Sequence, residues 1–159
     1  MENAKHAEIP MSLSLTLDDS KSKPLETEDH HRYRCLIRRL MFMAVGTRAD
    51  LAFSVNRLSQ YLSEPRIVHL QAAKHILRYL INKTKLGILY TNERLEPRTL
   101  IGFADAAYAN ARESRSTLGN CFLITGGPVT WTSQKQSITA QSTTESEYIS
   151  LSDATKQVI

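Results

Sequence analysis

The sequence predicts an α+β protein, in which a helical region precedes an antiparallel sheet with one helix packed on it. The main observation is a change of period near Lys85. Apolar residues recur every three or four positions before it and at alternate positions after it. The composition agrees, since 42% hydrophobic and 23% charged residues are typical of a folding chain. We therefore expect an irregular arm (residues 1–31), a helical region (32–85) and a region of strands with one helix (86–159).

The arm mixes polar, charged and scattered apolar residues without a lasting period. A first helix is expected over about residues 33–45, where apolar residues recur at helical spacing, with Gly46 as its C-cap. Thr47 and Asp50 form a Thr-x-x-Asp signal that predicts the start of a second helix. A third helix is expected after residues 63–65, because Pro65 is tolerated only in a first turn.

The positive charge of the chain is concentrated in its middle. Residues 1–30 have a net charge of −4 and residues 91–159 a net charge of −1. Residues 31–90 hold eleven Lys or Arg and two acidic residues, a net charge of +9. Such a block attracts phosphate backbones, although basic residues also serve simply to solvate helices. The third helix is expected to group three of these side chains on or just beyond its exposed side: Lys74, Arg78 and Lys85.

Alternation after Lys85 predicts four strands and a final helix. The strands cover about residues 86–91, 99–105, 117–125 and 129–133. Gly126-Gly127-Pro128 is turn chemistry between the last two strands. The hydroxyls of Ser142-Thr143-Thr144 favour a helix start, and the helix is expected to run from there to the end.

Asp105 ends the second predicted strand and is a candidate for chemistry. By alternation its side chain shares a face with Ile101 and Phe103, the larger apolar residues of the strand. A carboxylate on the core-facing side of a strand is costly unless it is paired or bound to a cation. The structural alternative is a strand-terminal Asp that caps the following turn.

The final helix carries two carboxylates, which its periodicity separates. Glu145 and Glu147 lie on opposite sides of a helical wheel of about 100° per residue. The residues within about 40° of Glu147 are apolar: Leu151, Ala154 and Val158. We therefore expect Glu147 to point toward the sheet and Glu145 to face water.

Glu145 also fits a capping box with Ser142, which gives it a sufficient structural role. Thr144 and Glu147 have the same spacing, so capping alone does not separate the two carboxylates. Their facing selects Asp105 and Glu147 as two inward carboxylates from different elements. Such a pair is what an oxygen-liganded Mg²⁺ site needs.

Several other kinds of site are not indicated. Cys35 and Cys121 lie 86 positions apart without CxxC spacing, so reduced thiols are expected. The histidines show no metal-ligand spacing, and no GxxxxGK[ST], GxSxG or HExxH motif occurs. There is no secretory signal and no apolar run of the roughly 18 residues that span a bilayer, so we expect an intracellular location, cytoplasmic or nuclear. Arg112 and Arg115 follow Asp105 in a polar loop that can meet a phosphate or simply be solvated.

A series of motifs runs through residues 32–159. They cover residues 33–37, 44–53, 57–63, 71–80, 102–106, 115–119, 127–133 and 142–152. In content and order they resemble the Pol polyproteins of copia-type LTR retrotransposons, from the end of the reverse transcriptase into the RNase H domain.

The resemblance implies a helical connection region followed by a truncated RNase H-like sheet with a packed helix. In that family a few carboxylates hold Mg²⁺ ions that cut the RNA strand of an RNA–DNA hybrid. Asp105 matches the first catalytic Asp and Glu147 the catalytic Glu. The implied partners are an RNA–DNA hybrid or other nucleic acid, and the remainder of the polyprotein. We assign five residues to nucleic-acid contact: Lys74, Arg78, Lys85, Arg112 and Arg115.

This sequence departs from the family pattern at points that bear on activity. In the family, the first catalytic Asp is usually followed by Ala-Asp-Trp-Ala-Gly-Asp. In this sequence, Asp105 is followed by Ala-Ala-Tyr-Ala-Asn-Ala at residues 106–111. The sequences of the family also continue beyond the position of Ile159 to a strand with a further metal-binding Asp. Asp153 cannot substitute, because it lies about 240° around the helix from Glu147. We expect a nuclease in the intact polyprotein, and for this chain alone either nucleic-acid binding without cleavage or an inactive transposon relic.

Overall fold

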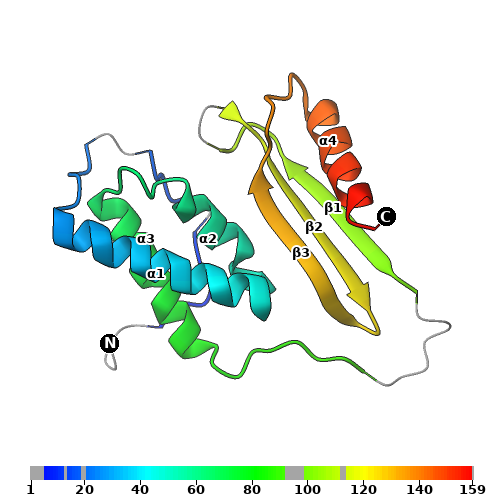
Figure 1. Cartoon of the computed structure of the whole chain (residues 1–159), viewed down its shortest axis with the longest axis horizontal. Helices are drawn as coiled ribbons and strands as arrows, with labels where there is room; N and C mark the ends of the chain where they lie inside the picture. The colour runs from blue at the N-terminus through cyan, green and yellow to red at the C-terminus, as the bar shows by residue number, and fades with distance from the viewer. Residues whose placement is uncertain (1–5, 13, 19–20, 92–98, 112–113, 159) are drawn as a thin grey trace. The chain divides into compact units, whose positions relative to one another are not determined.

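The structure is a computed structural model that describes residues 6–12, 14–18, 21–91, 99–111 and 114–158. The chain forms two compact units, Met1–Gly87 and Ile88–Ile159. Helices make up the first unit, and a sheet with one helix makes up the second (Figure 1). The predicted α+β class is therefore confirmed. In the described parts of the chain, no helix has both the length and the apolar character to cross a bilayer.

The described residues of the first unit form three α-helices and one short 3-10 turn. They are α1 (Thr27–Gly46), η1 (Ala49–Leu51), α2 (Ala52–Ser59) and α3 (Ile67–Asn82). The buried residues of α1 are spaced by four, three and four positions, which places them in one stripe: Tyr33, Ile37, Leu40 and Ala44. This stripe packs on apolar residues of η1, α2 and α3, chiefly Leu51, Val55, Leu58 and Ile76. The three predicted helices are confirmed, although α1 begins at Thr27 rather than near Tyr33.

The N-terminal arm is irregular and packs on the three helices. Its residues Ala7, Met11 and Leu17 are buried in the same core. Two histidines of α3 hold its backbone: the Nε2 of His69 donates to the Leu17 carbonyl (2.9 Å) and the Nε2 of His75 to the Ile9 carbonyl (3.0 Å). The arm is therefore an integral layer of the helical unit.

The predicted start signal of the second helix is wrong. Neither η1 nor α2 has a side-chain capping hydrogen bond at its N-terminus. The Asp50 carboxylate instead accepts hydrogen bonds from Arg48 and Tyr79. Two parallel hydrogen bonds from a positively charged guanidinium add the attraction of opposite charges, which a capping bond from a neutral backbone N–H lacks, so the ion pair outcompetes capping for the same carboxylate.

The second unit is built on a three-stranded antiparallel sheet in the order β1-β2-β3. The strands are β1 (Ile101–Ala107), β2 (Thr117–Ile124) and β3 (Gly127–Lys135). Thr125 and Gly126, both with positive φ (49° and 78°), form the two-residue turn between β2 and β3. Positive φ at both positions is the hairpin geometry that matches strand twist, and it favours glycine. A turn between these strands is confirmed, but Gly127 and Pro128 of the predicted Gly126-Gly127-Pro128 turn belong to β3.

Helix α4 (Thr143–Lys156) packs against β1 and β2 (Figure 1). The buried residues of β2 alternate along the strand at Leu118, Asn120 and Phe122. Leu118 lines a groove together with residues of α4, so this is the sheet face that the helix covers. The predicted helix packed on an antiparallel sheet is confirmed.

The predicted strand over residues 86–91 is not formed. This segment makes one backbone hydrogen bond to the β2–β3 hairpin, from Thr91 N to the Thr125 carbonyl (3.2 Å). The Tyr90 hydroxyl also donates to the Pro128 carbonyl (2.8 Å). The segment therefore lies beside the hairpin turn without a ladder of hydrogen bonds, and alternation alone did not make it a strand. The predicted connection at residues 92–98 lies outside the described residues.

Candidate functional site

The N-terminus of α4 is fixed by capping. The Oγ of Ser142 accepts the backbone N–H of Glu145 (3.1 Å), as the predicted capping box requires. The Glu145 carboxylate accepts the backbone N–H of Gln141 (2.7 Å), one residue before the N-cap. Glu145 is exposed and has the structural role that the sequence predicted.

Glu147 lies two residues further on and borders a groove between α4 and β1. The groove has a volume of about 580 Å³ and is lined by Ala104, Thr143, Thr144, Glu147, Tyr148 and Leu151. Its polar groups are one carboxylate and three hydroxyls. The hydroxyls of Thr143 and Thr144 come four and three positions before Glu147, so helical spacing identifies them in the sequence once Glu147 is chosen.

The predicted buried stripe of α4 is wrong. Leu151 and Val158 are 56% and 50% exposed, and Glu147 is exposed with them. The buried residues of the helix are the small ones: Ser146, Ser150 and Ala154. Small side chains let a helix approach a sheet closely, whereas the wheel argument had placed the largest apolar residues at the contact. Glu147 therefore borders the interface with β1 and is not enclosed by it.

Asp105 lies on the sheet face that α4 does not cover. β1 pairs with β2 in unbroken register, and Ala104, which faces α4, pairs with the buried Asn120. The next residue belongs to the opposite face, where Asp105 has Ile101 and Phe103 as same-face neighbours, as predicted. Those two residues are 52% and 58% exposed, and Asp105 is exposed as well. The expectation that this side of the strand faces the core is therefore wrong.

A short hydrogen bond joins the two candidate segments. The hydroxyl of the fully buried Ser150 donates to the backbone carbonyl of Asp105 (2.6 Å). Ser150 follows Glu147 by three residues, which is less than one turn of helix. The helix that carries Glu147 is thus attached to β1 at the residue that carries the other candidate carboxylate.

These carboxylates do not supply a complete set of ligands for two Mg²⁺ ions. Magnesium prefers six oxygen ligands, and a two-metal site needs several carboxylates. In the part of the chain that the structure describes, no group of three or more Asp, Glu, His or Cys side chains can hold a metal ion. Asp105 and Glu147 also belong to different sides of β1.

The three basic residues predicted on or just beyond the third helix have different surroundings, and Lys85 lies three residues after the end of α3. Lys74 and Lys85 are exposed. Arg78 is half-buried, lies 3.4 Å from His75 Nδ1, and borders a groove formed by α3 and the N-terminal arm. The side chains of Lys74 and Lys85 are therefore accessible to a phosphate group, whereas the N-terminal arm limits the access of a phosphate group to Arg78.

Arg115, in the second unit, donates to the Ser137 carbonyl (2.9 Å) and so ties the loop after β1 to the segment after β3. This is a structural contact in the loop for which solvation or phosphate binding was expected. Arg112 lies outside the described residues.

Comparison with known proteins gives the family. The chain is 34% identical over 165 residues to the Retrovirus-related Pol polyprotein from transposon TNT 1-94 of Nicotiana tabacum, covering 100% of this chain and 12% of that protein. It is 33% identical over 159 residues to the Pol polyprotein from transposon RE1 of Arabidopsis thaliana, covering 99% of this chain and 10% of that protein. The chain belongs to the copia-type retrotransposon Pol polyprotein family.

The chain thus spans about a tenth of the length of these Pol polyproteins. It is also 42% identical over 128 residues to "Secreted RxLR effector protein 161" of Plasmopara viticola, covering 80% of this chain and 89% of that protein. No protein-family model and no solved structure matches the chain. The sheet and helix of the second unit are compatible with a small RNase H-like arrangement.

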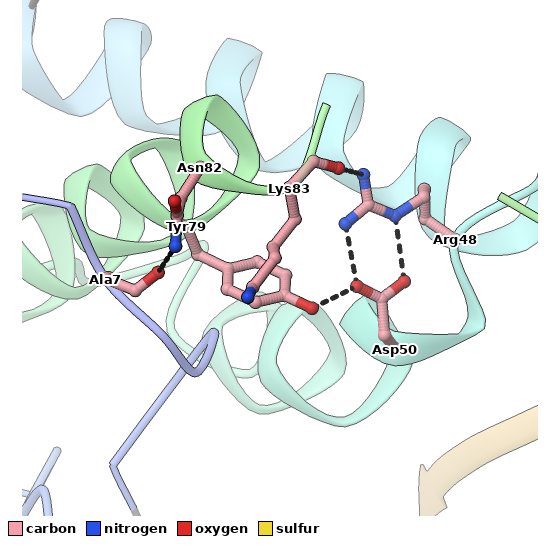
Figure 2. Close-up of polar contacts among 6 residues, drawn as sticks. All are labelled: Ala7, Arg48, Asp50, Tyr79, Asn82 and Lys83. Atoms are coloured by element: carbon pink, nitrogen blue, oxygen red, sulfur yellow. Dashed lines mark hydrogen bonds and ion pairs between the residues drawn. The ribbon is translucent and has the colours of Figure 1, made fainter. Parts of the chain in front are cut away.

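Sequence reasoning missed one polar cluster in the helical unit of this Pol segment (Figure 2). The Nε and Nη2 of Arg48 donate to the two oxygens of Asp50 (2.9 and 2.8 Å), and the Tyr79 hydroxyl donates to Asp50 Oδ2 (2.8 Å). Arg48 Nη1 also donates to the Lys83 carbonyl (3.3 Å). The cluster joins the loop after α1 to the end of α3. The Arg-x-Asp spacing was its only local signal, because Tyr79 comes 29 residues after Asp50.

Proposed function

We propose that this chain is the part of a copia-type Pol polyprotein that connects the reverse transcriptase to the RNase H domain, together with the N-terminal part of that RNase H domain, and that it binds RNA–DNA hybrids. In the intact polyprotein, Asp105 and Glu147 are two of the carboxylates that hold Mg²⁺ for hydrolysis of the RNA strand. Lys74 and Lys85, in the block with a net charge of +9, contact the phosphate backbone.

The observation that carries the proposal is the hydrogen bond from Ser150 Oγ to the Asp105 carbonyl (2.6 Å). It attaches α4 to β1 within three residues of Glu147 and at the backbone of Asp105, so it joins the two segments that carry the candidate carboxylates, although the two side chains lie on different sides of β1. The groove beside Glu147 adds three hydroxyls that can bind a sugar or phosphate oxygen. The choice of reaction, hydrolysis of the RNA strand of a hybrid, is based on membership of the Pol family.

Cleavage is not expected from this chain alone. The described residues offer two carboxylates where two Mg²⁺ ions need more. An incomplete ligand set removes the charge stabilisation of the attacking and leaving oxygens, which is the main catalytic contribution of the metal ions. Binding needs only the basic block, so it does not depend on the missing ligands.

The test is a binding and cleavage assay on the purified 159-residue chain with a labelled RNA–DNA hybrid. We expect an affinity that falls steeply with rising salt and no hydrolysis above background in Mg²⁺. Lys74→Gln with Lys85→Gln should weaken binding and reduce the salt slope by about 2, since each phosphate contact contributes about one unit. Absent or salt-insensitive binding would contradict the proposal. Mg²⁺-dependent cutting that Asp105→Asn abolishes would show a complete site and overturn the account of the ligands.

A secreted effector role is a second candidate, because it is the description of the Plasmopara viticola relative that is 42% identical. The 159 residues contain no Arg-x-Leu-Arg tetrapeptide. Expression of the chain with a C-terminal reporter separates the candidates. Release of the reporter from cells without lysis favours the effector role, and retention favours the Pol role.

A further inference from the structure

The outer face of α1 concentrates positive charge that is not paired among the described residues. Residues 31–49 hold five arginines and no acidic residue. Arg32 pairs with Glu28 and Asp29, and Arg48 pairs with Asp50. The other three are exposed and have no ion pair or hydrogen bond with any described residue: Arg34, Arg38 and Arg39.

Two of these arginines share a helix face with exposed apolar side chains. On a helical wheel of about 100° per residue with Arg34 at zero, Val45 falls at about 20°, Arg38 at about 40° and Phe42 at about 80°. The four residues therefore lie within one sector of the helix surface. Phe42 is 83% exposed and Val45 is 71% exposed. We call Arg34, Arg38, Phe42 and Val45 the arginine–phenylalanine face. It lies away from the buried stripe of α1, so it takes no part in the core.

This combination fits one class of partner better than others. Proteins that bind single-stranded nucleic acid combine basic side chains along the backbone with aromatic rings on which unpaired bases stack. Arg34, Arg38 and Phe42 follow one another at about 6 Å along the helix axis, so charge and ring can engage one strand. A duplex keeps its bases stacked inside and offers no base face to an exposed phenylalanine.

A membrane surface is a poorer fit. Interfacial helices insert a broad apolar face into lipid, but the broad apolar face of α1 is occupied by the core of the helical unit. The exposed large apolar residues of α1 are Phe42, Met43 and Val45, all near its C-terminal end, which is too small a surface for insertion along the helix.

We propose that the arginine–phenylalanine face of α1 binds single-stranded nucleic acid, with Arg34 and Arg38 on phosphates and Phe42 stacked on a base. This goes beyond the proposed hybrid binding, because it concerns an unpaired strand and a surface separate from Lys74 and Lys85. It does not depend on Asp105 or Glu147. A Pol segment with both surfaces can hold a hybrid and the unpaired strand next to it.

The test measures binding of a fluorescent oligothymidine to the full chain by anisotropy at several salt concentrations. Arg34→Gln with Arg38→Gln should weaken binding at least about tenfold and reduce the salt slope by about 1.4, since each phosphate contact to a single strand contributes about 0.7. Phe42→Ala should weaken binding about fivefold or more without changing the salt slope, because a lost base stack is worth about 1–3 kcal/mol.

Arg32→Gln is the matched control. It removes the same charge from the same helix, about 160° from Arg34, at a residue already paired with Glu28 and Asp29. It should change the affinity by less than about twofold, because its charge is already compensated. Circular dichroism of each variant checks that the helices remain folded.

Three results would overturn the proposal. One is an equal loss of affinity in Arg32→Gln, which would show a diffuse charge effect. Another is an unchanged affinity in Phe42→Ala, which would show that no base stacks there. The third is that Phe42→Ala abolishes binding to vesicles of anionic phospholipid while oligothymidine binding persists. Hybrid binding that fails in the unmodified chain while oligothymidine binding persists would refute the proposed function and support this inference.

Discussion

The polar cluster of Arg48, Asp50 and Tyr79 makes a strong prediction about the stability of the helical unit (Figure 2). Asp50→Ala removes the acceptor of three hydrogen bonds. The Arg48 side chain is 8% exposed, so it would keep its charge in a buried position, with the Lys83 carbonyl at 3.3 Å and the Tyr79 ring at 5.7 Å as its remaining partners. Removing one partner of a buried ion pair costs about 3–5 kcal/mol. The Asp50 side chain is 27% exposed, so water reaches the site and lowers this cost. We therefore expect Asp50→Ala to reduce the free energy of unfolding of the helical unit by about 2–3 kcal/mol.

The assay is urea unfolding followed by two signals. Far-ultraviolet circular dichroism mainly reports the helical unit, because α1, α2 and α3 have 20, 8 and 16 residues against 14 in α4. Fluorescence of Trp131, the one tryptophan, reports the sheet unit. A loss of about 2–3 kcal/mol should lower the urea midpoint of the helical unit by about 1–2 M, given a slope of about 1–3 kcal/mol per molar urea.

Glu28→Ala is the control, because it removes an ion pair whose two side chains are 66% and 78% exposed. Such a pair contributes about 0.5 kcal/mol or less. A midpoint shift for Asp50→Ala no larger than that of Glu28→Ala would refute the reasoning. An equal shift of the Trp131 transition would refute the assignment of the effect to the helical unit.

The same cluster predicts a pH dependence. Burial alone would raise the pKa of Asp50, but hydrogen bonds from Arg48 and Tyr79 outweigh it and hold the pKa below its usual value. A carboxyl group whose pKa is lower in the folded than in the unfolded state stabilises the fold. This contribution is complete when the pH is above the pKa of the unfolded state, which is about 3.9. That stability is lost as the pH falls below this value through the folded pKa. The urea midpoint should therefore fall on acidification below about pH 4, and less so in Asp50→Asn.

Two further predictions concern the sheet unit and the arm. Asn120 is 5% exposed and neither polar atom of its side chain has a hydrogen-bond partner among the described residues, so Asn120→Leu should raise the stability of the Trp131 transition by about 1–2 kcal/mol. Gln136→Leu is the control and should not raise the stability, because Gln136 donates to the Ser146 carbonyl (2.9 Å) and the substitution removes that hydrogen bond. A loss of stability in Asn120→Leu would mean that the Asn120 amide does have a partner. Leu17 is 1% exposed, so Leu17→Ala should cost about 2–4 kcal/mol in the helical unit and speed proteolysis of the arm, and an unchanged cleavage rate would contradict the packing.

The sequence by itself determined the order and type of most elements, because their signals are local. The spacing of apolar residues predicted α1, α2 and α3, and the glycines and proline at 126–128 predicted a turn that forms one residue earlier, at Thr125-Gly126. The capping of α4 by Ser142 followed from a hydroxyl three positions before an acidic residue. These interactions form between residues a few positions apart, so the chain needs no distant partner to specify them. The family resemblance was equally accessible, since it depends on motif content and order.

Only the tertiary structure decided which partner each polar or small group takes. Asp50 matched a capping signal, but a neighbouring arginine and a tyrosine from α3 compete for the same carboxylate and win. Ser150 is polar, yet it is buried, because a small side chain lets the helix approach β1 and its hydroxyl donates to the Asp105 carbonyl. Hydrophobicity ranks residues by their cost in water, whereas close packing selects them by size and by the bonds available at the contact. That second criterion depends on the opposing surface, which no local pattern contains.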